Sequence, residues 1–84
     1  MINSDLVIMW KEENNHLVKS FKFKDFKEAF AFITKVALLS EKLNHHPEWT
    51  NSWNRVHIRI TTHSAGNTVT DKDHKMAQEI DLLA

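Results

Sequence analysis

The sequence predicts an α+β domain in which an antiparallel sheet of about four strands carries helices on one face. Three observations predict it: short segments of alternating apolar and polar residues, two longer segments with apolar residues at helical spacing, and a chain with a single Gly and a single Pro. The apolar face of a sheet must be buried against another element, and helices with one apolar stripe can pack against it. We expect residues 1–84 to form one domain.

The first two strands are predicted on either side of a tight turn. In the segment 6–11 every second residue, starting from Leu6, is large and apolar, as on one face of a strand. Residues 12–15, Glu-Glu-Asn-Asn, should form the turn, because asparagine tolerates the left-handed backbone of a hairpin. Phe21 and Phe23 alternate with lysines, so a second strand with one solvated face should complete the hairpin.

The longest predicted element is a helix from about Asp25 to Asn44. Asp25 followed three residues later by Glu28 is typical of a helix start, where acidic side chains bind free backbone N–H groups. Apolar residues follow at helical spacing: Phe26, Ala29, Phe30, Ile33, Val36, Ala37 and Leu43. Pro47 disfavours helical geometry at His46, so the helix should end near Asn44.

Two more extended segments are predicted after this helix. Residues 48–53 should be extended, with a turn near Asn51 or Asn54. From Val56 to Ile60 every second residue is a branched apolar one, and the residues between them are polar. This alternation predicts a strand that is buried on one face.

The chain should close with a loop and a second helix. The loop covers residues 64–67, Ser-Ala-Gly-Asn. Thr70 and Asp73 stand three residues apart, a spacing typical of a capped helix start. Met76 and Ile80 then share one side of the helix and should join the core.

Composition and charge exclude several classes of function. Eleven Lys and Arg balance eleven Asp and Glu, so we expect no nucleic acid or anionic membrane as a partner. The chain has no cysteine, and no apolar run approaches the roughly 20 residues of a membrane span. The N-terminus lacks the order of a secretory signal, so a cytoplasmic protein is expected. A domain this small buries little core, which favours a homodimer or homotetramer.

Six histidines in 84 residues are the first chemical signal. His45 and His46 directly follow the main helix and His63 ends the long strand, and such element ends often carry catalytic groups. Imidazoles both give and take protons near neutral pH, so they suit general acid–base chemistry. Since His63 shares the strand parity of His57 and Arg59, a site that contains it should lie at a rim or a subunit boundary.

Other interpretations of these side chains stay open. Single histidines are often solvated surface residues, as we expect for His16 and His74. Three histidines can also bind zinc, but adjacent ones diverge and helical spacings of three or four suit zinc better, so we expect no metal. Trp49 and Trp53 could form a wall that stacks on a flat heterocycle, or they could belong to the core.

The stretch from Glu41 to Trp49, Glu-Lys-Leu-Asn-His-His-Pro-Glu-Trp, resembles the signature of the pterin-4a-carbinolamine dehydratases. In that signature an aromatic residue follows, here Trp53, and then a histidine ten residues on, here His63. An aspartate closes it after a short, variable distance, here Asp73. The similarity covers nearly the whole chain. Family members usually carry a further helix before the first strand, for which this chain leaves too little room.

The resemblance implies a 4a-hydroxytetrahydrobiopterin dehydratase, a hydro-lyase that removes water from 4a-hydroxytetrahydropterin to give quinonoid dihydropterin. This reaction recycles the pterin cofactor of aromatic amino acid hydroxylases and requires no cofactor of its own. It implies His45 and His63 as the proton-transfer pair and His46 as the group that mainly holds the pterin. Family members form dimers or tetramers.

The expected supporting residues come from the same stretch and from the last helix. We expect His46, Pro47 and Trp49 to bind the substrate. Glu41 and Asp73 could orient the histidines, or each could be a helix-end charge. The alternative function is a non-catalytic module on the same fold that binds another protein or dimerises.

Overall fold

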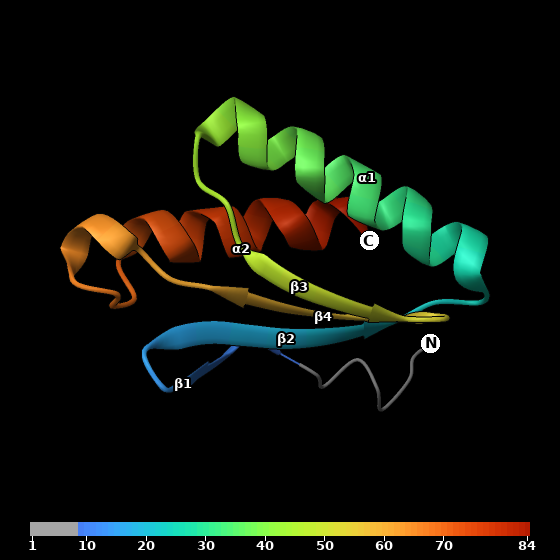
Figure 1. Ribbon diagram of the computed structural model, residues 1–84, viewed down its shortest axis with the longest axis horizontal. Coiled ribbons are helices and arrows are strands. Elements are labelled where there is room, and N and C mark those ends of the chain that lie inside the picture. The colour runs from blue at the N-terminus through green and yellow to red at the C-terminus, as the bar shows by residue number, and fades with distance from the viewer. Residues whose placement is uncertain (1–8) are drawn as a thin grey trace.

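The computed structural model describes residues 9–84 and has four strands and two α-helices in that range. In chain order the elements are β1 (Lys11–Glu13), β2 (His16–Lys22), α1 (Phe26–Leu43), β3 (Glu48–Ser52), β4 (Arg55–Ile60), the short 3₁₀ helix η2 (His63–Ala65) and α2 (Asp71–Leu83). The strands form one antiparallel sheet in the order β1-β2-β4-β3. Both helices lie on one face of this sheet (Figure 1), so the predicted α+β class is confirmed.

The first hairpin lies further along the chain than the sequence predicted. The strand was expected at residues 6–11, whose first three residues lie outside the described part of the chain, and β1 starts at the last residue of that segment, Lys11. Its pairing with β2 continues through Glu13, so only Asn14 and Asn15 form the turn. These two have φ values of 49° and 64°. A two-residue hairpin turn requires this left-handed backbone, and asparagine accepts it more readily than glutamate.

Both ends of α1 lie where the sequence predicted them. The Asp25 side chain accepts a hydrogen bond from the Glu28 N–H at 2.9 Å, and the Glu28 side chain accepts one from the Lys24 N–H at 2.9 Å. At the other end Asn44 adopts a left-handed φ of 51°. This cap turns the chain out of the helix immediately before His45, so the helix end decides where the tandem histidines lie.

The core fills the space between the sheet and the two helices. Val56, Ile58 and Ile60 are fully buried, which confirms the alternation predicted for β4. The other buried apolar side chains packed with them are Leu17, Phe21, Ala29, Phe32, Ile33, Val36, Met76, Ala77 and Ile80. The helices cover only the face of the sheet that carries these residues. The opposite face carries no helix in the described part of the chain, and on it Lys22 and Arg55 are exposed whereas Val18 is buried.

The turn between β3 and β4 lies at Trp53 and Asn54, and the other predicted position, Asn51, is inside β3. Trp53 has a left-handed φ of 49° and its residue is 63% exposed, so the core interpretation of this side chain is wrong. Trp53 lies outside both strands, and its side chain does not join the core. The buried Asn54 side chain donates to the carbonyl of Phe23 at 2.9 Å, which joins this turn to the end of β2.

Candidate active site

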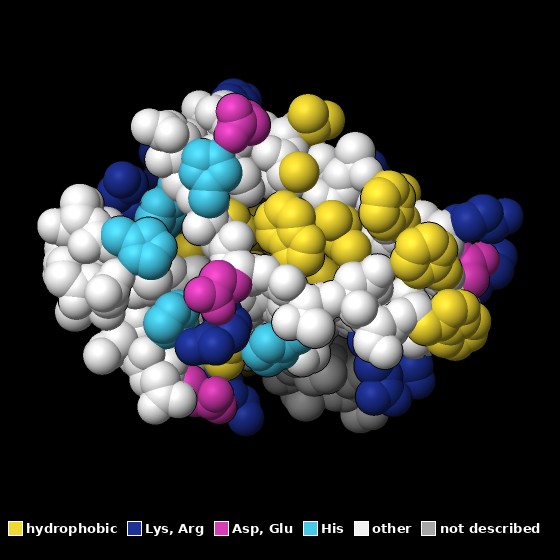
Figure 2. Space-filling model, in the orientation of Figure 1, with side chains coloured by type: hydrophobic (Ala, Val, Ile, Leu, Met, Phe, Trp, Pro, Cys, Tyr) yellow, Lys and Arg dark blue, Asp and Glu magenta, His cyan; other side chains and the backbone are white. Residues whose placement is uncertain are grey.

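Three histidines from two distant parts of the chain line one depression. It has a volume of about 240 Å³ and is lined by Asn44, His45, His46, Thr62, His63, Ser64 and Lys72. Histidine side chains gather at the end of the molecule where α1 ends and α2 begins (Figure 2). The volume is below the roughly 300–1,000 Å³ typical of ligand pockets, so a ligand bound here would remain partly open to solvent.

His45 is the buried member of the three, with 8% of the residue exposed. Its Nε2 lies 2.7 Å from Oδ1 of Asp73. Because a carboxylate only accepts hydrogen bonds, Nε2 of His45 must carry the proton, which fixes the tautomer of the neutral ring. In residues 9–84 every buried side-chain nitrogen or oxygen has a hydrogen-bond partner. The Nδ1 atom of His45 has no partner within that range, and it is therefore not buried but reaches solvent.

Asp73 is fully buried, with 0% of its surface exposed. Its Oδ2 accepts hydrogen bonds from the Thr62 hydroxyl at 2.6 Å and from the Thr70 N–H at 2.8 Å. Burial raises the pKa of Asp73, but the hydrogen bonds from Thr62, Thr70 and His45 and the charge of His45 together lower that pKa below its ordinary value. Asp73 is therefore a carboxylate at neutral pH. The predicted capping box of α2 is present, and it uses this same carboxylate.

His46 and His63 are exposed, and each is held by one oxygen atom. Nδ1 of His63 lies 2.6 Å from Oδ1 of Asn67, and Nε2 of His46 lies 2.6 Å from Oε2 of Glu41. In both pairs the ring donates, so the second ring nitrogen stays available. All three histidines of the depression thus share one arrangement, in which an oxygen of the protein orients the ring and leaves one nitrogen for a ligand.

Two residues expected to bind the substrate, Pro47 and Trp49, are not among the residues that line this depression. Trp49 lies on the edge strand β3, where it pairs with Ile58, and is 38% exposed. Pro47 directly follows His46 in the chain. The expected part of both residues in substrate binding stays a prediction.

Three residues of the site were missed by the sequence interpretation. Thr62, Asn67 and Lys72 match no motif, and each lies within a few residues of His63 or Asp73. Asn67 has a left-handed φ of 59°, which a search for asparagines in short loops could have found. Thr62 ends a strand pattern in which threonine is common, so its hydrogen bond to Asp73 gave no sequence signal.

Residues 9–84 contain neither a metal-binding cluster nor a membrane-spanning helix. No three or more His, Cys, Asp or Glu side chains are grouped so that they could hold a metal ion. Neither α-helix in that range has the length and apolar character needed to cross a bilayer.

Comparison with known proteins links the chain to one family. The family model described as "Pterin 4 alpha carbinolamine dehydratase" matches residues 2–83. A protein of Prochlorococcus marinus strain SARG is 51% identical over 74 residues, which are 88% of this chain and 76% of that protein. A protein of Rhizorhabdus wittichii is 56% identical over 66 residues, covering 79% and 67% of the two chains. Both relatives are provisionally named pterin-4-alpha-carbinolamine dehydratases.

Two solved structures share the fold. A transcriptional coactivator/pterin dehydratase from Brucella melitensis superimposes with a TM-score of 0.84 at 47% identity, covering 89% of this chain and 81% of that one. A pterin dehydratase-like protein identified as a RuBisCO assembly factor in the alpha-carboxysome gives a TM-score of 0.78 at 26% identity, with coverages of 89% and 88%.

Asp73 should make the stability of the protein depend on acid pH. Its pKa is lowered in the folded chain, whereas an aspartate in an unfolded chain titrates near about 3.9. The stability that this difference contributes is present above the unfolded pKa and is lost as the pH falls from there towards the folded pKa. The free energy of unfolding, measured by urea denaturation, should therefore fall more steeply below about pH 4 in the wild type than in Asp73→Asn.

The matched control is Asp71→Asn, an exposed aspartate in the same helical turn, which should keep the wild-type steepness. If Asp73→Asn does not fold, Thr62→Val removes one hydrogen bond to the carboxylate and should reduce the same steepness in part. If the free energy of unfolding falls equally steeply with pH in the wild type, Asp73→Asn and Thr62→Val, the lowered pKa of Asp73 is contradicted.

Proposed function

The chain belongs to the pterin 4 alpha carbinolamine dehydratase family, and we propose that it removes water from 4a-hydroxytetrahydropterin to give quinonoid dihydropterin. The observation that carries this proposal is the convergence of His45, His46 and His63 on one depression. Imidazoles exchange protons at neutral pH, which this dehydration requires. The proposal assigns the chain to the recycling of the pterin cofactor of aromatic amino acid hydroxylases, in the cytoplasm.

The proposed reaction breaks one C–O bond and moves two protons. Hydroxide is a poor leaving group at neutral pH, so an imidazolium protonates the hydroxyl as it departs as water. The lone pair of the adjacent ring nitrogen forms the C=N double bond, and a neutral imidazole removes a proton from the ring system. His45 and His63 take these acid and base roles, and His46 holds the pterin.

The hydrogen bonds behind the rings support this division of roles. Asp73 takes the Nε2 proton of His45, which leaves Nδ1 as the atom of this ring that can exchange a proton with the substrate. Asn67 holds Nδ1 of His63 in the same way and leaves Nε2. In the proposal Asp73, Asn67 and Glu41 are positioning residues, because each acts through a histidine.

The proposal is tested first by stopped-flow kinetics with freshly generated carbinolamine. The protein should accelerate dehydration well beyond the spontaneous rate. His45→Ala or His63→Ala should lower kcat by about 10²–10⁴-fold, the usual contribution of a general acid or base. His46→Ala should mainly raise KM, because the proposal gives this ring a binding role.

The control for these variants is His74→Ala, an exposed histidine in α2 that is not among the residues lining the depression. It should keep wild-type kinetics. Circular dichroism checks that each variant is folded. The catalytic assignment is wrong if the three site variants, all folded, keep wild-type kcat and KM.

A non-catalytic module is the second candidate function. The observation that favours it is the shared fold with a RuBisCO assembly factor, although that protein is only 26% identical. On this alternative the chain acts through its surface, and the histidines carry no reaction. A wild-type protein that fails to exceed the spontaneous dehydration rate would favour the module over the enzyme.

We also propose that the working unit is a homodimer or a homotetramer. Phe26 and Phe30 of α1 are largely exposed, and their ring centroids lie 5.7 Å apart. Hydrophobic side chains gather on the visible face between α1 and β3 and beside the start of α1 (Figure 2). Clustered apolar surface of this kind is typical of protein contacts, and a second copy over it would bury these rings.

Sedimentation equilibrium should therefore give the mass of a dimer or a tetramer at micromolar concentration. Phe30→Lys places a charge in the apolar cluster and should increase the monomer fraction. Ala31→Lys adds the same charge at the neighbouring exposed position of α1 and should change the mass distribution less. A wild-type protein that sediments as a monomer would contradict this part of the proposal.

A further inference from the structure

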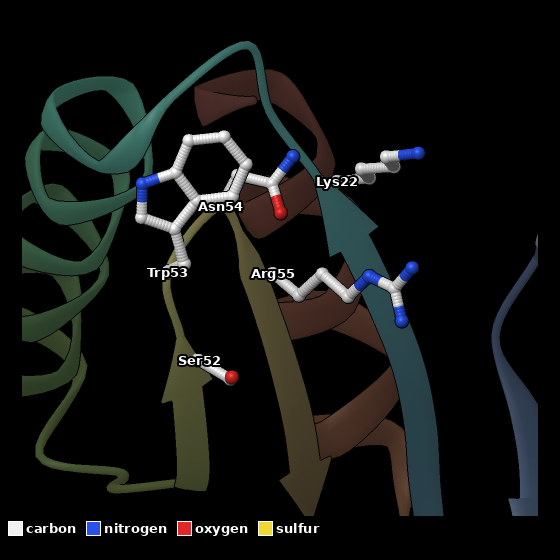
Figure 3. Close-up of a pocket in the computed structure, with 5 residues that line it drawn as sticks. All are labelled: Lys22, Ser52, Trp53, Asn54 and Arg55. Atoms are coloured by element: carbon white, nitrogen blue, oxygen red, sulfur yellow. The ribbon is translucent and has the colours of Figure 1, made fainter.

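A second depression lies on the face of the sheet that the helices leave open. Lys22 of β2 pairs in register with Arg55 of β4, which also pairs with Ser52 of β3. Paired residues of antiparallel strands project to the same face, and here it is the face opposite the buried Val56. The depression has a volume of about 370 Å³ and is lined by Lys22, Ser52, Trp53, Asn54 and Arg55 (Figure 3).

This depression is separate from the histidine site. It shares none of that site's lining residues, and its volume falls within the roughly 300–1,000 Å³ of ligand pockets. A neighbouring hollow of about 360 Å³ continues from Lys22, Ser52 and Arg55 to the side chains of Ser20, Thr50 and His57. In this hollow the Ser20 hydroxyl and Nδ1 of His57 are hydrogen-bonded to each other at 2.7 Å, and most of the lining surface is apolar.

The two cations form an unfavourable pair in the sheet. Like charges directly opposite each other on neighbouring strands destabilise the pairing. The lysine and arginine ion pairs found in residues 9–84 are those of Lys19 with Asp81 and of Arg59 with Glu48, and neither Lys22 nor Arg55 takes part in one. A bound anion would remove the repulsion, and a guanidinium binds phosphate oxygens in a bidentate manner.

Trp53 supplies a flat apolar surface at the other end of the depression. Its indole lies on the side of α1, and the head groups of Lys22 and Arg55 point to the other side (Figure 3). The residue is 63% exposed and holds a left-handed backbone, so the protein places a large aromatic ring in solvent at a conformational cost. Exposed aromatic rings of this kind stack on planar heterocycles.

We propose that this depression binds a small molecule that joins a flat heterocycle to a phosphate group, of the chemical class of the nucleoside monophosphates. Lys22 and Arg55 bind the phosphate oxygens, the Ser52 hydroxyl donates to one of them, and Trp53 stacks on the ring. A single-stranded nucleic acid fits less well, because a strand needs a track of cations and the chain has no net charge.

The site is tested by titrating ¹⁵N-labelled protein with AMP at constant ionic strength. Saturable shifts are expected in the amide signals of residues 22 and 52–55 and in the indole N–H of Trp53. Adenosine lacks the phosphate and inorganic phosphate lacks the ring, so each should bind roughly tenfold more weakly than AMP. An oligothymidylate that binds much more tightly than AMP would overturn the assignment to a small molecule.

Two charge-removing variants complete the test. Lys22→Gln and Arg55→Gln should each weaken AMP binding roughly tenfold, because each removes one charged donor to the phosphate. Lys35→Gln on α1 removes the same charge outside the depression and should bind AMP as the wild type does. All three side chains are exposed, so the fold should be kept. Unchanged affinity in both variants, or the same shifts with sodium chloride alone, would overturn the proposal.

Discussion

The hydrogen bond between Nε2 of His45 and Oδ1 of Asp73, 2.7 Å long and buried, is the interaction on which the histidine site depends. The same carboxylate also binds the Thr62 hydroxyl and the Thr70 N–H. One side chain thereby joins three segments: the exit of α1, the end of β4 and the start of α2. A buried polar group that loses its hydrogen-bond partner lowers the stability of the fold by about 1–3 kcal/mol. The His45 ring, the Asp73 carboxylate, the Thr62 hydroxyl and the Thr70 N–H therefore stabilise one another's positions.

This unit explains why the histidines differ. His45 is fixed from behind by a fully buried carboxylate, whereas His46 and His63 stand at the rim and are held by exposed oxygens. In the proposed reaction a flat substrate enters from solvent past the two exposed rings and meets the ring of His45, whose orientation Asp73 fixes. The depression is shallow because a sheet with one helical layer has no third wall at its end. The proposed second copy of the chain would supply more cover.

Much of the fold was predictable because its signals are local. The caps of α1 at Asp25 and Asn44 and the alternation of β4 depend on neighbouring residues, and the structure has both. The first hairpin continues through Glu13, which was expected in the turn, because only the two asparagines form the turn. For Trp53 the sequence left two interpretations open, the core and a wall that stacks on a heterocycle. The core interpretation was wrong because Trp53 lies in a turn and not in the extended segment expected for it. The family resemblance identified the three histidines of the site. The hydrogen bonds of Thr62 to Asp73 and of His63 to Asn67 could not be predicted, because they form only when the loop and the helix start fold together.

The central claim is that the three imidazoles surround one pterin. A crystal structure of the protein with a stable dihydropterin analogue tests it most directly. The account predicts the bicyclic ring in the depression, with Nδ1 of His45 and Nε2 of His63 within hydrogen-bond distance of it and Asp73 still bound to Nε2 of His45. An analogue bound elsewhere on the protein, with the histidine depression empty, would contradict it.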